Sequence, residues 1–164
     1  MGLLKVGDKI PDFECLDDKG NTVKTEDLLS SKCVIFFYPK ANTPGCTAQA
    51  CNLSENFSKL KKKGFSIYGV SADKVKSQSS FSTKFGGFPY PLLADVNRDI
   101  INSFGAWGLK KFMGREYEGI LRTTFITDDK GIITRVIDKV KTKDHTNQIL
   151  NLWLVICSQI ISAL

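Results

Sequence analysis

Histidine is almost absent from this chain of 164 residues, since His145 is the only one. A zinc site needs about four ligands, so this scarcity argues against a metal centre, and nothing else in the sequence suggests a cofactor. The chain also lacks internal repeats, low-complexity stretches and linker-like segments. With 42% hydrophobic and 24% charged residues, the sequence predicts a single globular domain that spans residues 1–164.

The first residues lack the long apolar segment of a secretory signal peptide, because the chain turns polar by Asp8. The cysteines do not suggest a secreted disulfide framework either, because their number is odd. They are Cys15, Cys33, Cys46, Cys51 and Cys157. Both absences predict a cytoplasmic, reducing location, where closely spaced cysteines more often do redox chemistry than hold a fold together.

Arginine-rich tracts are missing as well, although the net charge is +6 and the pI is about 9.1. The lysines lie in short clusters at residues 59–63, 110–111 and 139–143. This distribution favours a solvated basic surface, so no nucleic-acid partner is expected. A non-catalytic binding module that uses the basic surface remains an alternative.

The hydrophobic pattern predicts an α/β fold, with a central mixed β-sheet flanked by helices and a small N-terminal β-hairpin. Residues 33–38 are apolar on both faces, which is typical of a central parallel strand. Further strands are expected at residues 65–70, 92–94, 123–127 and 132–137, and the hairpin at residues 13–16 and 22–24. Helices are expected at residues 26–30 with Thr25 as N-cap, from Pro44 to a stop at Gly64, at residues 74–85 with Asp73 as N-cap, at 98–104 and at 144–164. We interpret residues 105–119 as a glycine-rich connection.

Cys46 lies in the first turn of the helix predicted after strand 33–38. Thr43 is the expected N-cap, and Pro44 suits the first helical position because its missing N–H would be unpaired there anyway. Cys46 then occupies the third helical position, where free backbone amides and the positive end of the helix dipole favour the ionised sulfur. Because the thiolate is the reactive form, this position predicts a nucleophile rather than a packing residue.

Cys51 follows five residues later. In a regular helix this separation puts the two Cα atoms roughly 8 to 9 Å apart, whereas a disulfide needs less than about 7 Å. If Cys46 and Cys51 pair, the first turns of the helix must unwind, and the site then has two states. The other cysteines have apolar or strand-like neighbours, so we expect core packing for Cys15, Cys33 and Cys157.

The motifs around Cys46 resemble those of a known protein family. Tyr38-Pro39, Thr43-Pro44-Gly45-Cys46-Thr47 and Ala50-Cys51 together resemble the active-site signature of the peroxiredoxins. The five-residue cysteine separation resembles their bacterioferritin-comigratory, or peroxiredoxin Q, branch. Residues 69–71, 104–108 and 119–125 support the resemblance, which covers about residues 6–150. It implies a thioredoxin-like fold and reduction of hydrogen peroxide and organic hydroperoxides, with electrons from thioredoxin or a similar dithiol protein.

The resemblance also implies roles for five residues by matching position. Cys46 would be the peroxidatic cysteine and Cys51 the resolving one, through a Cys46–Cys51 disulfide. Pro39 would shield the thiolate from water, and Thr43 would hydrogen-bond the thiolate and hold the peroxide oxygen. Arg122 would supply a fixed positive charge, and such preorganised groups are worth most against charge that develops in the transition state.

Residues 151–164 carry no charged side chain and form an atypical apolar tail. The tail is shorter than the ~20 apolar residues that span a bilayer, so we expect it to dock on the core or on a partner subunit, in a monomer or weak homodimer with no membrane span. Two alternatives to the peroxidase with two active cysteines stay open. One is a one-cysteine peroxidase in which Cys51 is dispensable. The other is a general thiol–disulfide oxidoreductase, which would not need Thr43 or Arg122.

Overall fold

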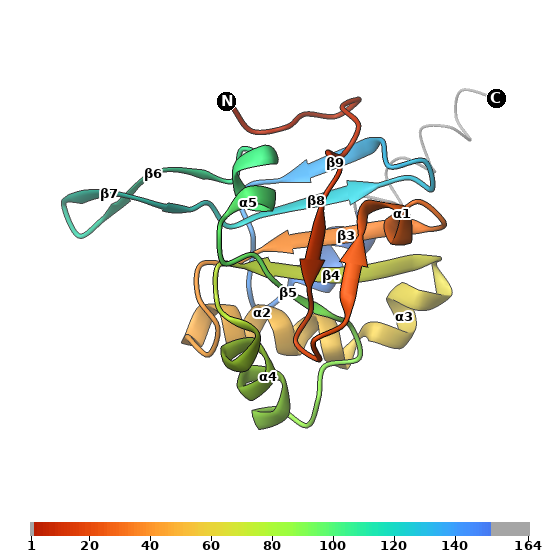
Figure 1. Cartoon of the computed structure of the whole chain (residues 1–164), viewed down its shortest axis with the longest axis horizontal. Helices are drawn as coiled ribbons and strands as arrows, with labels where there is room; N and C mark the ends of the chain where they lie inside the picture. Colours follow the sequence, from red (N-terminus) through yellow and green to blue (C-terminus); the bar gives the residue numbers. More distant parts are fainter. Residues whose placement is uncertain (1, 152–164) are drawn as a thin grey trace.

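A five-stranded mixed sheet forms the centre of the computed structural model, which describes residues 2–151 (Figure 1). Its strand order is β5-β4-β3-β8-β9. The strands are β3 (Lys32–Phe37), β4 (Phe65–Ser71), β5 (Leu92–Ala94), β8 (Thr123–Thr127) and β9 (Ile133–Ile137). β3 pairs with β4 and β4 with β5 in parallel, whereas β3–β8 and β8–β9 are antiparallel. The predicted mixed sheet is therefore confirmed.

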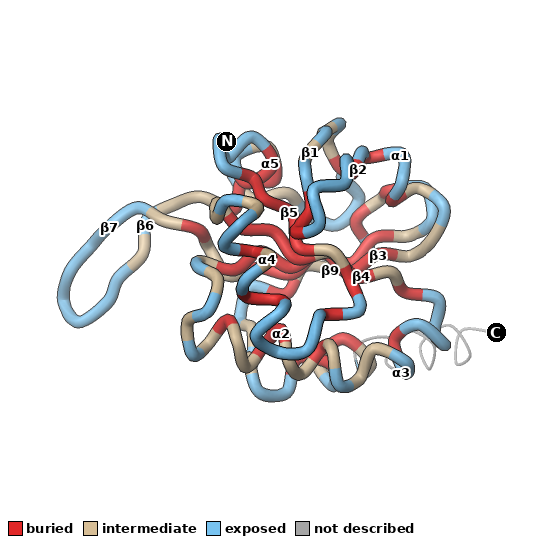
Figure 2. Tube along the Cα trace, turned by 60° about the horizontal axis from the view of Figure 1, so that its bottom comes forward, coloured by how far each residue is buried: buried red, intermediate tan, exposed pale blue. Residues whose placement is uncertain are grey.

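Helices cover both faces of this sheet (Figures 1 and 2). One face carries α2 (Pro44–Glu55), α3 (Phe57–Lys62) and α4 (Val75–Lys84). The other carries α1 (Thr25–Leu28), α5 (Asp99–Ser103) and the predicted N-terminal hairpin, β1 (Glu14–Leu16) and β2 (Thr22–Lys24).

The sheet has a hydrophobic core on each face, and strand β3 contributes side chains to both, because successive side chains of a strand point to opposite faces. Val34 and Phe36 belong to the core under α2 and α4, whereas Ile35 and Phe37 belong to the core under α1 and α5. All four side chains are at most 2% exposed. Burial on both faces explains the unbroken apolar run that the sequence shows here.

The prediction that Thr25 caps α1 was wrong, since the N-cap is Lys24. The Thr25 hydroxyl instead donates to the Pro11 carbonyl (3.1 Å) and accepts from the Phe13 amide (2.7 Å). The carboxylate of Asp27 accepts from the Lys24 amide at 2.8 Å. Thr25 therefore ties the N-terminal segment to α1.

Asp73 does not cap α4 either, because the N-cap is Lys74 and makes no side-chain cap bond. Asp73 Oδ2 accepts from the Ala41 amide at 2.7 Å and from Ser71 Oγ at 2.6 Å. The carboxylate therefore binds the loop that leads to Cys46.

The long helix predicted from Pro44 to Gly64 is two helices, because α2 ends at Glu55 and α3 begins at Phe57. Asn56 separates them, with φ −104° and ψ 13°. Its side-chain amide donates to the Asn52 carbonyl at 2.8 Å, and such local bonds compete with the regular helical pattern.

The stretch interpreted as a glycine-rich connection is a second hairpin, β6 (Trp107–Phe112) and β7 (Arg115–Ile120). The turn residues Met113 and Gly114 both have positive φ, 50° and 77°, which is the geometry of a two-residue hairpin turn. This hairpin projects from the body of the molecule (Figures 1 and 2). The prediction failed because its strands are mostly exposed and lack the alternation of a half-buried strand.

At the C-terminal end, residues 145–151 are helical, in agreement with the predicted terminal helix. The rest of that prediction lies outside the described residues, as do Cys157 and the proposed docking of the tail. None of the helices among residues 2–151 has the length and apolar character that a membrane crossing requires.

Candidate active site

Cys46 occupies the first turn of α2, the helix that follows β3 in the chain. Thr43 is the N-cap and Pro44 the first helical residue, so both predicted positions are confirmed. The Cys46 thiol is in the core at 1% exposure. At the third helical position its backbone amide has no partner within the helix. The expected helix start is therefore present, with the sulfur shielded from bulk solvent.

Arg122 directly precedes β8, whose first residue, Thr123, pairs with Phe37 at the end of β3, and its side chain contacts the Cys46 sulfur. Its Nη2 donates to Cys46 Sγ at 3.3 Å, and its Nη1 donates to Gln49 Oε1 at 2.7 Å. A Cβ added at Gly45 would lie 3.3 Å from Nη2, so glycine at this position leaves room for the guanidinium. The residues brought together here are 76 positions apart in sequence.

Gln49 is a site residue to which the sequence assigned no role, beyond its standing where many peroxiredoxins carry an acidic residue. It is fully buried, and its carbonyl oxygen orients Arg122. Its amide nitrogen Nε2 is also buried and makes no hydrogen bond to any group within residues 2–151. Because Gln49 lies one turn after Cys46, helical spacing combined with burial was the signal that could have found it.

Thr43 and Pro39 lie in the loop between β3 and α2, and both are partly exposed. The Thr43 hydroxyl donates to the Lys40 carbonyl at 2.9 Å and makes no side-chain cap bond to α2. Asp73 holds the same loop through the Ala41 amide. The structure thus places Thr43 and Pro39 next to the helix start, while the direct contact to the sulfur comes from Arg122.

Cys51 lies on the same continuous helix and is partly exposed. Cys46 and Cys51 are both free cysteines, with no disulfide between them. Burial raises the pKa of Cys51, and the nearby Glu55 carboxylate raises it further. The two cysteines of α2 therefore have opposite electrostatic neighbours, a guanidinium at Cys46 and a carboxylate at Cys51.

Lys110 is a second residue that sequence reasoning missed, because residues 110–111 were interpreted as solvated surface. Its Nζ donates to the Ile120 carbonyl at 2.9 Å. Burial lowers the pKa of Lys110, the charge of Arg122 lowers it further, and Cys46 acts in the opposite direction. The Lys110 ammonium therefore adds a positive charge near the sulfur. A prediction of the β6–β7 hairpin would have indicated that Lys110 lies near Arg122.

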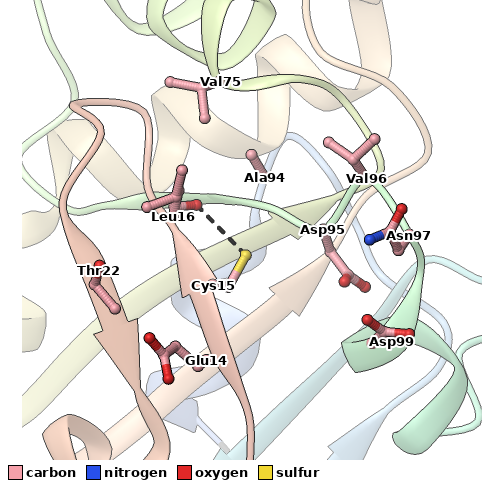
Figure 3. A pocket seen from close by; sticks show the side chains of 10 residues that line it. All are labelled: Glu14, Cys15, Leu16, Thr22, Val75, Ala94, Asp95, Val96, Asn97 and Asp99. Carbon is pink, nitrogen blue, oxygen red and sulfur yellow. Dashed lines mark hydrogen bonds between the residues drawn. The ribbon is translucent and has the colours of Figure 1, made fainter.

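The remaining described cysteines are not placed for this chemistry. Cys33 is fully buried in β3, and burial raises its pKa, so its predicted role in the core is confirmed. Burial and the charge of Asp95 raise the pKa of Cys15 to about 11, which keeps it a thiol. Cys15 borders a cavity of about 460 Å³ on the α5 side of the sheet (Figure 3). None of the five predicted site residues lines this cavity.

These features define a class of protein. A buried cysteine in the first turn of a helix, with a guanidinium on its sulfur, suits reduction of a peroxide bond. The chain belongs to the AhpC/TSA family, whose model matches residues 6–136, and it is a peroxiredoxin, a peroxidase of thioredoxin-like fold in the bacterioferritin-comigratory branch.

Individual relatives show which members of this family the chain resembles. The chain is 42% identical to peroxiredoxin Bcp of Escherichia coli (strain K12) over 154 residues, which cover 94% of this chain and 97% of that protein. It is similar to the crystal structure of peroxidoxin BcpB from Mycobacterium tuberculosis, with a TM-score of 0.79, 33% identity, and coverage of 90% and 95%. A structure of the Xanthomonas campestris bacterioferritin comigratory protein, studied for alkyl peroxide reduction, aligns with a TM-score of 0.82, 28% identity, and coverage of 94% and 97%.

Proposed function

We propose that Cys46 reduces hydrogen peroxide and organic hydroperoxides, and that Cys51 then resolves the oxidised sulfur through an intramolecular disulfide. The observation that carries the first step is the contact of 3.3 Å between Arg122 Nη2 and the buried Cys46 sulfur. The alkyl peroxide activity of the Xanthomonas campestris relative supports the inclusion of organic hydroperoxides.

In the first step the Cys46 thiolate attacks one peroxide oxygen. An S–O bond forms while the O–O bond breaks, and the leaving oxygen takes a proton and departs as water or an alcohol. Sulfur is oxidised by two electrons to a sulfenic acid, and the peroxide is reduced. Negative charge moves from sulfur to the two oxygens, so the preorganised donors of Arg122 and the first-turn amides act where charge develops. In this proposal Thr43 holds the peroxide oxygen and Pro39 limits access of water.

In the second step the Cys51 sulfur attacks the sulfenic sulfur, an S–S bond forms and water leaves. Both cysteines belong to the intact helix α2, in which they lie too far apart for a disulfide. The turns between them must therefore unwind. A thioredoxin-like dithiol then reduces the disulfide by thiol exchange. We propose a cytoplasmic setting for this cycle, with the protein a monomer or weak homodimer.

The first experiment measures peroxide consumption with thioredoxin and its reductase as the electron source. Cys46→Ser is expected to abolish turnover, and Cys15→Ser, a matched change away from the site, to leave it unaffected. Undiminished turnover in Cys46→Ser would overturn the peroxidase assignment to this residue.

The second experiment tests the resolving step. Mass spectrometry of non-reduced, peroxide-treated protein is expected to show the Cys46–Cys51 disulfide, and Cys51→Ser is expected to lose turnover with thioredoxin while retaining the first reaction with peroxide. Full turnover in Cys51→Ser would instead establish the one-cysteine alternative.

A further inference from the structure

The residue that follows Cys51 ties α2 to a distant segment of the chain. Asn52 Nδ2 donates to the Lys143 carbonyl at 3.1 Å, and Asn52 Oδ1 accepts from the Thr146 amide at 2.8 Å. Thr146 Oγ1 also donates to the Asn52 carbonyl at 3.3 Å. Three hydrogen bonds therefore join the Cys51 end of α2 to residues 143–146.

Residues 143–146 are themselves held by the sheet. His145 is fully buried, with its Nε2 2.8 Å from Thr124 Oγ1 on β8 and its Nδ1 2.8 Å from Gln148 Oε1. Thr146 is 2% exposed. The segment that holds Asn52 is therefore anchored independently of α2.

The Cys46 end of α2 is held in a different way, through Arg122. Oxidation of Cys46 converts a negatively charged sulfur into a neutral sulfenic acid, which weakens its attraction to the guanidinium. The hydrogen bonds of Asn52 involve only neutral groups and do not depend on the state of the sulfur. A further neutral bond, from Tyr90 Oη to the Ala50 carbonyl at 2.6 Å, holds the same end.

We propose that Asn52 is a positioning residue for the resolving cysteine. It fixes the Cys51 end of α2, so that the helix unwinds only in the turns before Cys51 and Cys46 moves towards a stationary Cys51. This inference rests on the proposed function, since it concerns how the disulfide forms. It assigns to Asn52 a role that neither cysteine nor Arg122 performs, which is to set where the unwinding stops.

Hydrogen–deuterium exchange of the reduced and disulfide forms tests the proposal. The disulfide is made in parallel with peroxide and with diamide, a thiol oxidant that does not need peroxidase chemistry. In the wild-type protein, disulfide formation should raise exchange in peptides from residues 43–55, because the amides of residues 52–55 bond to carbonyls of the turn that unwinds. Peptides from residues 56–62 and 143–151 should be unchanged. In Asn52→Ala, the ratio of oxidised to reduced exchange in those last two regions should rise about fivefold or more, the effect expected from losing two hydrogen bonds.

The ratio separates positioning from a general structural role, which would raise exchange equally in both forms. Asn52→Asp keeps the acceptor for Thr146 but loses the donor to Lys143, so it should lie between wild type and Asn52→Ala. Asn147→Ala is the matched control, because among residues 2–151 its side chain bonds only to the exposed Asp144. It should behave as wild type.

Three results would overturn the proposal: deprotection of residues 143–151 in the oxidised wild-type protein, an unchanged ratio in Asn52→Ala, or failure of both oxidants to give the Cys46–Cys51 disulfide. If diamide gives the disulfide and peroxide does not, the proposed function fails, while the diamide-made form still decides the role of Asn52.

Discussion

The two ends of helix α2 are stabilised by different kinds of contact. Near its start, Cys46 and Gln49 both bind the charged guanidinium of Arg122. From Ala50 onwards, the helix is held by neutral hydrogen bonds from Tyr90 and to Asn52. The first end therefore responds to the charge of the sulfur and the second does not. This difference suggests how one helix can be intact for the reaction with peroxide and open for disulfide formation.

The largest effect on the reaction with peroxide is expected from removing the guanidinium of Arg122 at the start of α2. Arg122→Met should lower the second-order rate constant of Cys46 with peroxide by about 10²- to 10³-fold, as for loss of one transition-state donor. Stopped-flow measurement of the first turnover checks this. Arg115→Met, at the exposed start of β7, is the matched control and should leave the rate unchanged.

Arg122→Lys should recover only part of the loss, because an ammonium keeps the charge but not the two-pronged contact with Cys46 and Gln49. A loss below about threefold in Arg122→Met would contradict the role of Arg122. It would favour the thiol–disulfide oxidoreductase, which uses the same cysteines without a guanidinium.

A second change separates the orientation of Arg122 from its charge. Gln49→Leu removes the acceptor for Nη1 and keeps the guanidinium, so the peroxide rate should fall about tenfold, the equivalent of one hydrogen bond to a charged group. Gln49→Glu restores an acceptor and should recover part of the rate, although its negative charge offsets that of Arg122. A rate in Gln49→Leu equal to that of Arg122→Met would show that orientation accounts for the whole effect.

A third change affects only the second end. Tyr90→Phe removes the bond to the Ala50 carbonyl and should lower the free energy of unfolding by about 1 kcal/mol, measured by urea denaturation, without changing the rate of Cys46 with peroxide. Tyr117→Phe on the exposed hairpin is the control and should have little effect on stability. A lower peroxide rate in Tyr90→Phe would show that the two ends are not independent.

The parts of this arrangement that depend on local patterns were predicted from the sequence. The apolar run of β3 and the Thr43-Pro44 helix start follow from burial on both faces and from capping preferences, so neighbouring residues suffice to indicate them. The β6–β7 hairpin was missed because Leu109 and Phe112 are exposed, which removes the alternation by which a strand is recognised.

The contacts of the site depend on residues far apart in the chain, and no local pattern encodes them. The position of Arg122 against Cys46 was expected only through the family resemblance. Asn52 and Lys110 were not identified because their partners lie on other segments, residues 143–146 for Asn52 and the end of β7 for Lys110. The predicted N-caps Thr25 and Asp73 failed for the same reason, since their side chains bind distant backbone groups instead.

The smallest effect is expected from pH, acting on the segment that holds the second end. Burial lowers the pKa of His145, and the charge of Arg122 lowers it further. Below its ordinary value of about 6.5, the unfolded chain therefore binds more protons at this residue than the folded one. Stability contributed by His145 is then complete above that value and is lost as pH falls towards the folded pKa.

As the pH falls from 7 to 6, protonation of His145 should lower the free energy of unfolding by up to about 0.7 kcal/mol. Urea denaturation measures this change. In His145→Gln this part of the slope should disappear, and because the chain has no other histidine, the difference in slope isolates this residue. Exchange in residues 143–151 should rise at the lower pH in wild type only, after correction for the intrinsic exchange rate. An equal slope in both proteins would contradict the lowered pKa of His145 and would mean that the segment holding Asn52 is insensitive to acid between pH 7 and pH 6.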